Sequence, residues 1–221
     1  MKLPHLMDAL YPKKCLFCKR VIPPDRDYCT ECAPHVRYLA DHFFLDTDPV
    51  GLFVQQADAA VYYNDVTGKA IKALKFHART ATVEGLTRML CRRYDEVFVP
   101  GMVDVILPVP LHQNRLRERG YNQSELLAKG LRRHTGLPME PHLLMRHRDT
   151  PAQSSLSGRV ERIGNLKDAF SCPRPELVHG RRILLIDDVC TTGSTLMECA
   201  RELHRCGAKC VMALTVMHTP K

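Results

Sequence analysis

Short apolar runs alternate along this 221-residue chain with stretches in which apolar residues recur at helical spacing. The clearest run is 183–186 (ILLI), which follows Gly180 and is typical of a buried strand in a parallel sheet. Residues 57–63 and 103–107 predict two further strands. A last strand is expected at 210–216, beside the 183–186 run.

Apolar residues at helical spacing predict helices between these strands. Two are expected at 66–77 and 83–94, and a third contains Leu126, Leu127 and Leu131. A fourth helix carries the apolar positions 196, 197, 200 and 203 and ends near Gly207, with arginines in its last turns. The pattern therefore predicts an α/β domain with a mostly parallel central sheet flanked by helices.

Two aspartates and a hydroxyl-rich loop separate the 183–186 strand from the fourth helix. Asp187 and Asp188 end the apolar run, and TTGST at 191–195 leads into the helix. Such a loop offers backbone N–H groups, hydroxyls and the positive end of a helix dipole, which together bind phosphate. Carboxylates instead bind hydroxyls or a metal. A ribose 5-phosphate therefore fits both parts of this stretch, with its hydroxyls at the aspartates and its phosphate at the loop. An ordinary strand-to-helix turn capped by Asp and Thr is the alternative.

Composition limits the class of protein. Hydrophobic residues make up 45% of the chain, which is ordinary for a globular protein. A run of 18 apolar residues and a signal-peptide pattern are both missing from the sequence, so we expect a soluble, cytoplasmic protein without membrane insertion. The formal net charge of +8 favours an anionic partner, either nucleic acid or a small polyphosphate. Neither GxxxxGK[ST] nor GxGxxG follows a strand.

Four of the ten cysteines have metal-binding spacing. They form a C-x2-C-x10-C-x2-C arrangement of Cys15, Cys18, Cys29 and Cys32. Two CxxC knuckles that face each other bind tetrahedral zinc, and the metal then supplies folding free energy to a module too small to bury a core. Reduced cysteines without metal are the alternative. The other cysteines are expected to be mostly buried thiols.

Basic residues cluster at two further places. Arg115, Arg117 and Arg119 follow the 103–107 strand, on a loop expected at the same edge of the sheet as the aspartates. A basic surface helix is the alternative for this segment. Lys72, Lys75 and Arg79 could line a site, but a solvated helix face is the commoner arrangement, and we interpret them as such a face.

Several motifs resemble known proteins. The 181–196 stretch closely resembles the PRPP-binding motif of type I phosphoribosyltransferases. The segment PVPLHQNRLRERGYNQSELLAKGL at 108–131 resembles the signature of the ComF/GntX family, phosphoribosyltransferase-like proteins that often carry an N-terminal zinc module. Residues 144–170 also match, and the resemblance runs from Cys15 to about Thr215. It implies a type I phosphoribosyltransferase-like α/β core at 37–221 and a small four-cysteine zinc ribbon at 1–36.

The resemblance also implies roles for individual residues. Asp187 and Asp188 would hold the ribose 2- and 3-hydroxyls. The 5-phosphate would lie against Cys190, Thr191, Thr192, Gly193, Ser194 and Thr195. On the pyrophosphate side the candidates are Pro110, Leu111, His112, Arg115, Arg159 and Arg162. Structural Zn2+, and Mg2+ arriving with PRPP, are the implied cofactors, whereas no catalytic residue is assigned.

A long polar segment at about 147–166 joins two expected strands. Such a segment inside a compact domain is typical of a mobile functional element or of disorder. In phosphoribosyltransferases the corresponding segment is a flexible loop that closes over PRPP. Carried over to this chain, Gln153, Arg159 and Arg162 would approach the pyrophosphate or the Mg2+ ligands.

Three functions remain open from the sequence. The first is Mg2+-dependent phosphoribosyl transfer to an unknown acceptor, and the second is PRPP sensing without catalysis. The third is nucleic-acid handling, because the family resemblance implies a link to DNA uptake in natural transformation. Single-stranded DNA and proteins of the competence machinery are then the candidate partners. The sequence leaves the acceptor and the oligomeric state open.

Overall fold

A parallel sheet forms the centre of the molecule. The computed structural model describes residues 12–76, 80–148 and 169–219. Its main sheet has four strands in the order β1–β6–β5–β2, and every neighbouring pair is parallel. These strands are β1 (Gln56–Tyr62), β2 (Val105–Pro108), β5 (Arg182–Cys190) and β6 (Cys210–His218). The predicted parallel sheet is confirmed.

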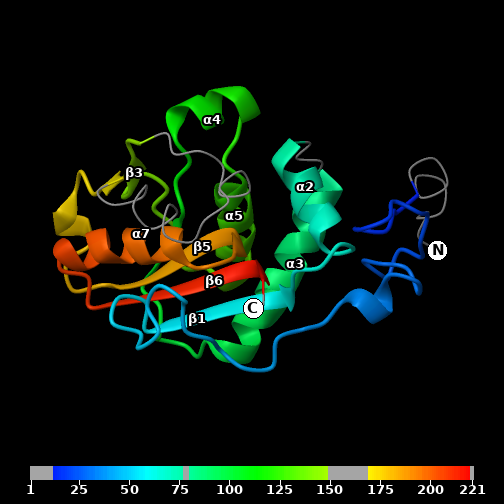
Figure 1. The fold of residues 1–221 in the computed structure, drawn as a ribbon, viewed down its shortest axis with the longest axis horizontal. Helices are drawn as coiled ribbons and strands as arrows, with labels where there is room; N and C mark the ends of the chain where they lie inside the picture. Colours follow the sequence, from blue (N-terminus) through cyan, green and yellow to red (C-terminus); the bar gives the residue numbers. More distant parts are fainter. Residues whose placement is uncertain (1–11, 77–79, 149–168, 220–221) are drawn as a thin grey trace.

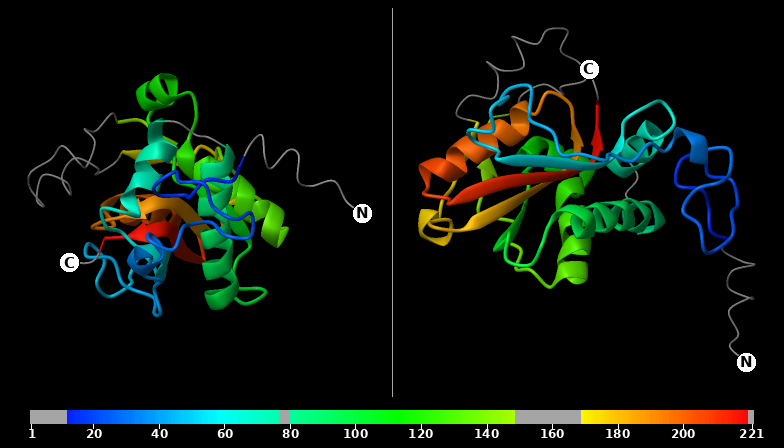
Figure 2. Two further views of the ribbon diagram at one scale, coloured as in Figure 1. Left: turned by 90° about the vertical axis from the view of Figure 1, so that its right-hand side faces the viewer. Right: turned by 90° about the horizontal axis from the view of Figure 1, so that it is seen from below.

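Helices cover both faces of the sheet (Figure 2). Helix α7 (Ser194–Arg205) lies on one face, and α3 (Thr80–Val97) and α5 (Gln123–Thr135) lie on the other. Helix α2 (Gly68–Phe76) packs against α3. The shorter elements are η1 (Ala33–His35), α4 (Gln113–Arg119), β3 (Met145–Arg146), β4 (Phe170–Ser171) and η3 (Pro175–Leu177). Within the described ranges, no helix is long and apolar enough to cross a membrane.

The apolar run on β5 contributes to both faces of the sheet. Ile183 and Leu185 belong to the core beneath α7, whereas Leu184 and Ile186 belong to the core beneath α3 and α5. A strand that is buried on both faces needs a continuous apolar run rather than alternation. This requirement explains the strongest signal in the sequence.

Two predicted boundaries are wrong. Strand β5 continues through the aspartates to Cys190, because Asp187 and Val189 still pair with β6. The aspartates therefore lie within the strand instead of after it. The arginine-bearing segment at 113–119 is helix α4 rather than a loop, and Gly120 ends it with φ +78°. In addition, β6 is an interior strand between β1 and β5.

The connector before β1 is ordered although its sequence shows no clear period. Phe43 forms a bridge with Ala57 on β1. The buried Asp48 carboxylate accepts the backbone N–H groups of residues 52, 53 and 54 at 2.7–2.8 Å. One aspartate thus holds a turn of this connector against the sheet.

The cysteine-bearing segment packs directly on the α/β core. Residues 12–36 lie beside α2 and α3 at one end of the molecule (Figure 1). Leu16 and Phe17 are buried in the same apolar cluster as Leu86 and Leu90 of α3. The division into units 1–36 and 37–221 stays a prediction, and the apolar core is continuous across it.

Candidate functional site

The phosphate-loop candidates surround the start of α7. Gly193 is the N-cap residue with φ +80°, and it brings no side-chain oxygen to cap the first amides of the helix. Uncapped amides at a helix N-terminus bind anions. Thr192 Oγ1 and Ser194 Oγ lie 2.8 Å apart, so the hydroxyls gather at the same point.

Close packing explains the glycine at position 193. A Cβ atom there would lie 2.7 Å from the Cβ of Leu45, on the connector before β1. Thr47 of the same connector donates its hydroxyl to the Thr192 carbonyl at 3.3 Å. The connector therefore supports the loop from outside.

Cys190 differs from the other predicted loop residues. It is 2% exposed, lies in the apolar cluster beneath α7, and burial raises the pKa of its thiol. Its side chain belongs to the core. A phosphate at the loop would therefore contact only its backbone.

The acidic pair lies at the carboxyl end of β5. Asp187 Oδ1 accepts hydrogen bonds from Ser124 Oγ of α5 and from the amide of Asp188, both at 2.8 Å. Burial and the neighbouring charge of Asp188 raise the pKa of Asp187 to about 7. Two close carboxylates that are both shielded from water resist double ionisation.

Asp188 is incompletely satisfied by the protein. It is only 4% exposed, and its Oδ2 atom has no hydrogen-bond partner among the described residues. Lys75 Nζ lies 3.2 Å from this oxygen, in an ion pair that lacks hydrogen-bond geometry. A buried carboxylate oxygen usually carries hydrogen bonds, so this one can accept a ligand hydroxyl.

Sequence reasoning considered Lys75 but assigned it to a solvated helix face. Arg79 of the same group lies outside the described residues. The Lys75 side chain is 34% exposed on α2, directly after the buried Leu74. The available signal was its position at the margin of the apolar face formed by Ile71 and Leu74. That position makes the side chain half-buried, but the sequence does not show which strand the helix faces.

The predicted pyrophosphate-side residues follow β2. The amide of Val109 donates to the carbonyl of Ile186 at 2.9 Å, which places this turn next to the acidic pair. Pro110, Leu111 and His112 line a cavity of about 430 Å³ that also contains His142 and Arg146. His112 caps α4 by accepting the amide of Asn114.

The basic residues do not all gather at one site in the described structure. Arg115 is half-buried on α4, whereas Arg117 is exposed. Gln153, Arg159 and Arg162 lie outside the described residues, together with most of the polar segment predicted at 147–166. The antiparallel pair β3–β4 flanks that segment.

The four predicted zinc ligands form one cluster. The sulfur atoms of Cys15, Cys18, Cys29 and Cys32 all lie within 4.8 Å of one another. Cys18 Sγ and Cys29 Sγ are 3.6 Å apart, close to the separation of about 3.8 Å that Zn–S bonds of about 2.3 Å impose in a tetrahedral site. The donor set therefore fits zinc.

Backbone geometry prepares this cluster for a cation. Burial alone would raise the pKa of Cys15, but amide hydrogen bonds from residues 18 and 29 lower it to about 6. The pKa of Cys32 is instead raised by burial and the neighbouring thiols, and that of Cys18 is also raised. Lys19, directly after the first knuckle, has φ +64°. Thiolate is the form that binds metal, so these amides favour metal binding.

A polar groove lies where the cysteine module meets α3. Tyr28, Tyr38, Arg88 and Arg92 contribute to its wall, and its volume is about 490 Å³. The two tyrosine hydroxyls are 3.1 Å apart, and Arg92 lies 4.4 Å from the centre of the Tyr38 ring. Arg88 is paired with Asp27, which reduces the net positive charge here.

Two protein-family models match the chain. A phosphoribosyl transferase domain matches residues 124–221, and a double zinc ribbon domain matches residues 6–43. The first match contains the acidic pair and the loop, and the second contains all four clustered cysteines. With the parallel sheet, they confirm the predicted α/β phosphoribosyltransferase-like core with an N-terminal zinc ribbon.

Curated relatives match most of the chain. It is 34% identical to the DNA utilization protein YhgH of Escherichia coli K12 over 93% of this chain and 90% of the relative. It is 32% identical to Competence protein F of Haemophilus influenzae over 82% and 80% of the two chains. Competence protein ComFC of Bacillus subtilis is 29% identical over 68% and 58%.

Solved structures also match. The allosteric regulatory enzyme of purine biosynthesis has a TM-score of 0.44 and 19% identity, covering 65% of this chain and 29% of that structure. Adenine phosphoribosyltransferase from Leishmania donovani has a TM-score of 0.40 and 13% identity, covering 66% and 68%. The curated relatives are closer in sequence and match over more of this chain. By their identity and coverage, the chain belongs to the ComF/GntX family of phosphoribosyltransferase-like proteins.

Proposed function

We propose that this protein binds PRPP at the carboxyl edge of the sheet and transfers its phosphoribosyl group to an acceptor. The 5-phosphate lies at the 191–195 loop and the start of α7. The ribose hydroxyls lie across Asp187 and Asp188, and the diphosphate lies toward the turn at 110–112. The phosphoribosyl transferase domain match at 124–221 supports this proposal.

One observation carries the proposal. Asp188 is almost fully buried and has an oxygen without a hydrogen bond from the described residues, on the same strand that leads to a helix whose N-cap glycine supplies no side-chain cap. A carboxylate that can accept hydrogen bonds from hydroxyl groups and a helix N-terminus that can bind phosphate are thus close together in the chain. A sugar phosphate satisfies both, whereas inorganic phosphate satisfies only the helix N-terminus.

The chemistry requires positioning and charge stabilisation. The bond from the anomeric carbon to the diphosphate breaks, the diphosphate leaves with the electron pair, and the acceptor forms the new bond to that carbon. The acidic pair and the loop hold the sugar from two sides, which orients the carbon for attack. Negative charge from Asp187 and Asp188 also favours positive charge that develops on the sugar.

Mg2+ is expected to accompany the substrate. It prefers oxygen ligands and commonly binds phosphates of a substrate, and the residues at this edge are carboxylates and hydroxyls that are compatible with it. When bound, it would supply positive charge to the departing diphosphate. The hydroxyl-rich loop and the acidic pair remain responsible for holding the sugar.

Calorimetry tests this proposal directly. PRPP should bind more tightly than ribose 5-phosphate in the presence of Mg2+, and ribose 5-phosphate more tightly than inorganic phosphate. A screen of amines and nucleobases should then identify an acceptor that releases pyrophosphate. Equal affinity for all three ligands would contradict the proposed site, and PRPP binding without turnover would favour PRPP sensing.

A second candidate function is the handling of single-stranded DNA. The relatives carry the names DNA utilization protein and Competence protein F, and the groove beside the cysteine module combines tyrosines with arginines. Aromatic rings that stack on bases and guanidinium groups that contact phosphates are typical of single-strand binding. Affinity for an oligonucleotide should then fall steeply with salt, independently of Mg2+ and PRPP.

A further inference from the structure

We propose that Lys75 is a positioning residue of the ribose site, whose ammonium group favours the ionised form of the Asp187–Asp188 pair, the form that accepts two hydroxyls. This inference rests on the proposed function, because it deepens the role of the same acidic pair. It assigns a specific task to a lysine that the sequence pattern assigns to a solvated surface.

The contact itself is the first support. Lys75 Nζ lies 3.2 Å from Asp188 Oδ2, and that oxygen has no hydrogen-bond donor among the described residues. Asp188 is 4% exposed whereas the Lys75 side chain is 34% exposed, so water screens this interaction only in part.

The charge of Lys75 acts on the pair against the effects of its other neighbours. Ser124 of α5 contributes a neutral hydroxyl to Asp187. Cys190 of β5 and Cys199 of α7 interact electrostatically with Asp187, and burial raises the pKa of both thiols, so they stay neutral. Lys75 lowers the pKa of Asp187, in opposition to burial and to the charge of the neighbouring aspartate.

The end of α2 is held in place independently of this ion pair. The hydroxyl of Tyr121 donates to the carbonyl of Leu74 at 2.8 Å, next to Lys75 in the chain. Leu74 itself is fully buried. The lysine is therefore presented to the acidic pair by packing of its helix, and a change of its side chain should leave the helix in place.

The ionised pair matters because of hydrogen-bond direction. A carboxylate accepts hydrogen bonds through both oxygens, whereas a protonated carboxyl group uses one oxygen as a donor. A protonated aspartate keeps one accepting oxygen, but the pair offers the most and the strongest acceptors to two ribose hydroxyls when both aspartates are ionised. Lys75 raises the fraction of molecules in this state near neutral pH.

The test uses the full-length protein with Lys75→Met and Lys75→Arg. Lys72→Met is the matched control, because Lys72 is an exposed lysine on the same helix. Ribose 5-phosphate and inorganic phosphate are titrated into each variant by calorimetry at pH 7 and pH 9. Carbon-13 NMR of aspartate carboxyl groups follows the ionisation of the same variants without ligand.

At pH 7, Lys75→Met should bind ribose 5-phosphate about 10-fold or more weakly, because loss of a close opposite charge shifts a carboxyl group by about one to three pKa units. Inorganic phosphate should change less than about twofold. The loss should be smaller at pH 9, where a larger fraction of the pair is ionised in each protein. Lys75→Arg and Lys72→Met should behave like the unmodified protein.

Three results would overturn the role of Lys75. They are an unchanged affinity of Lys75→Met for ribose 5-phosphate, an equal loss of affinity for both ligands, or a loss at pH 9 as large as the loss at pH 7. The NMR titration separates this inference from the proposed function. If the unmodified protein does not prefer ribose 5-phosphate over phosphate, the proposed function fails. The NMR titration then decides the inference about Lys75: a shift of the carboxyl titration to higher pH in Lys75→Met supports it, and an unchanged titration contradicts it.

Discussion

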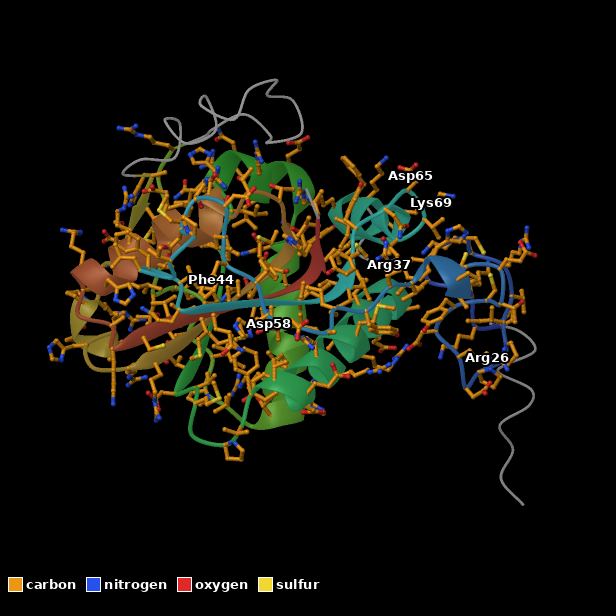
Figure 3. All side chains as sticks on the ribbon, turned by 60° about the horizontal axis from the view of Figure 1, so that its bottom comes forward. Arg26, Arg37, Phe44, Asp58, Asp65 and Lys69 are labelled. Atoms are coloured by element: carbon orange, nitrogen blue, oxygen red, sulfur yellow. The ribbon has the colours of Figure 1, made fainter. Side chains whose placement is uncertain are left out.

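Asp58 on β1 and Asp188 on β5 are both buried carboxylates in the same sheet, yet the protein treats them differently. Asp58 is 0% exposed and accepts hydrogen bonds from Arg93 at 2.6 and 3.2 Å and from Gln56 at 2.7 Å. Asp188 is 4% exposed and has only the ion pair with Lys75 on its Oδ2 atom among the described residues. Figure 3 shows Asp58 in the middle of the molecule, on the strand that runs beside β6.

The difference separates structure from function. A buried carboxylate is tolerated when the surrounding chain supplies its hydrogen bonds, and Arg93 does so for Asp58 from α3. Asp188 is left incomplete at the edge where ligands bind in parallel α/β sheets. The cysteine cluster is a third case, because four close sulfur atoms need a cation that the chain does not provide.

The largest expected effect concerns this third case. Purified protein should contain about one zinc per chain, and Cys15→Ser should lose the metal and unfold the cysteine module, because metal binding supplies its folding free energy. Thermal unfolding and elemental analysis measure both effects. Cys210→Ser, outside the cluster, is the control and should keep the zinc. Metal-free protein of unchanged stability would contradict the zinc assignment.

Arg93→Met tests the buried carboxylate whose hydrogen bonds the protein supplies, that of Asp58. It leaves the Asp58 carboxylate buried without its cation, so the free energy of unfolding should fall by about 3–5 kcal/mol. Arg92→Met is the control, because Arg92 is an exposed neighbour paired with Glu96 and should cost less than about 1 kcal/mol. Urea denaturation measures both. Similar losses of unfolding free energy in the two variants would contradict the claim that the buried Arg93–Asp58 pair is essential to the fold.

Asp187→Asn tests the Asp187–Asp188 pair through the pH dependence of the free energy of unfolding. The pKa of Asp187 is raised from 3.8 to about 7, so the folded state binds this proton more tightly than the unfolded chain. The associated stability is present below about pH 4 and is lost as pH rises to 7. At pH 8 the variant should therefore be more stable by up to about 4 kcal/mol, since the pKa is raised by about 3 units and each unit corresponds to about 1.4 kcal/mol.

Asp104→Asn provides a control of opposite sign. Arg182 lowers the pKa of Asp104 to about 2, so the stability from this pair is present above about pH 4 and lost as pH falls toward 2. This variant should be destabilised at pH 8, by less than about 1 kcal/mol because the pair is partly exposed. If both variants changed stability in the same direction at pH 8, the electrostatic description of the acidic pair would be wrong.

Thr192→Val should have the smallest effect. It removes the hydroxyl that contacts Ser194 at the start of α7, so phosphate and PRPP should both bind about 5-fold more weakly, a typical loss for one hydrogen bond. Thr47→Val removes only the donor to the Thr192 carbonyl and should change either affinity less than twofold. A change in PRPP affinity without a change in phosphate affinity would contradict the placement of the 5-phosphate at the 191–195 loop. A valine at Gly193 would be a poor test, because its Cβ would clash with Leu45.

Local signals explain what the sequence could predict. The apolar run, the acidic pair and the glycine before α7 are adjacent in the chain, so their order alone indicates strand, loop and helix. The four cysteines likewise have a spacing that brings them together whatever surrounds them. Both features appear in the structure, as β5 with α7 and as one cluster of sulfur atoms.

Long-range packing explains what the sequence could not predict. The position of Lys75 depends on how α2 packs against α3, which brings its side chain to Asp188 of β5, more than 100 residues later in the chain. Asp48 organises its loop through three backbone amides that carry no sequence signal. Helix α4 has no buried residue and hence no apolar period to reveal it.

The most direct test of the central claim compares PRPP with inorganic phosphate in the double variant Asp187→Ala, Asp188→Ala at fixed Mg2+. If the pair recognises ribose, PRPP affinity should fall by about 100-fold or more, as expected for two charged hydrogen-bond acceptors, while phosphate affinity stays within about twofold. Thermal unfolding of the ligand-free variant provides the structural reference. A variant that loses stability but keeps its preference for PRPP would show that the two aspartates serve the fold and that the ribose lies elsewhere.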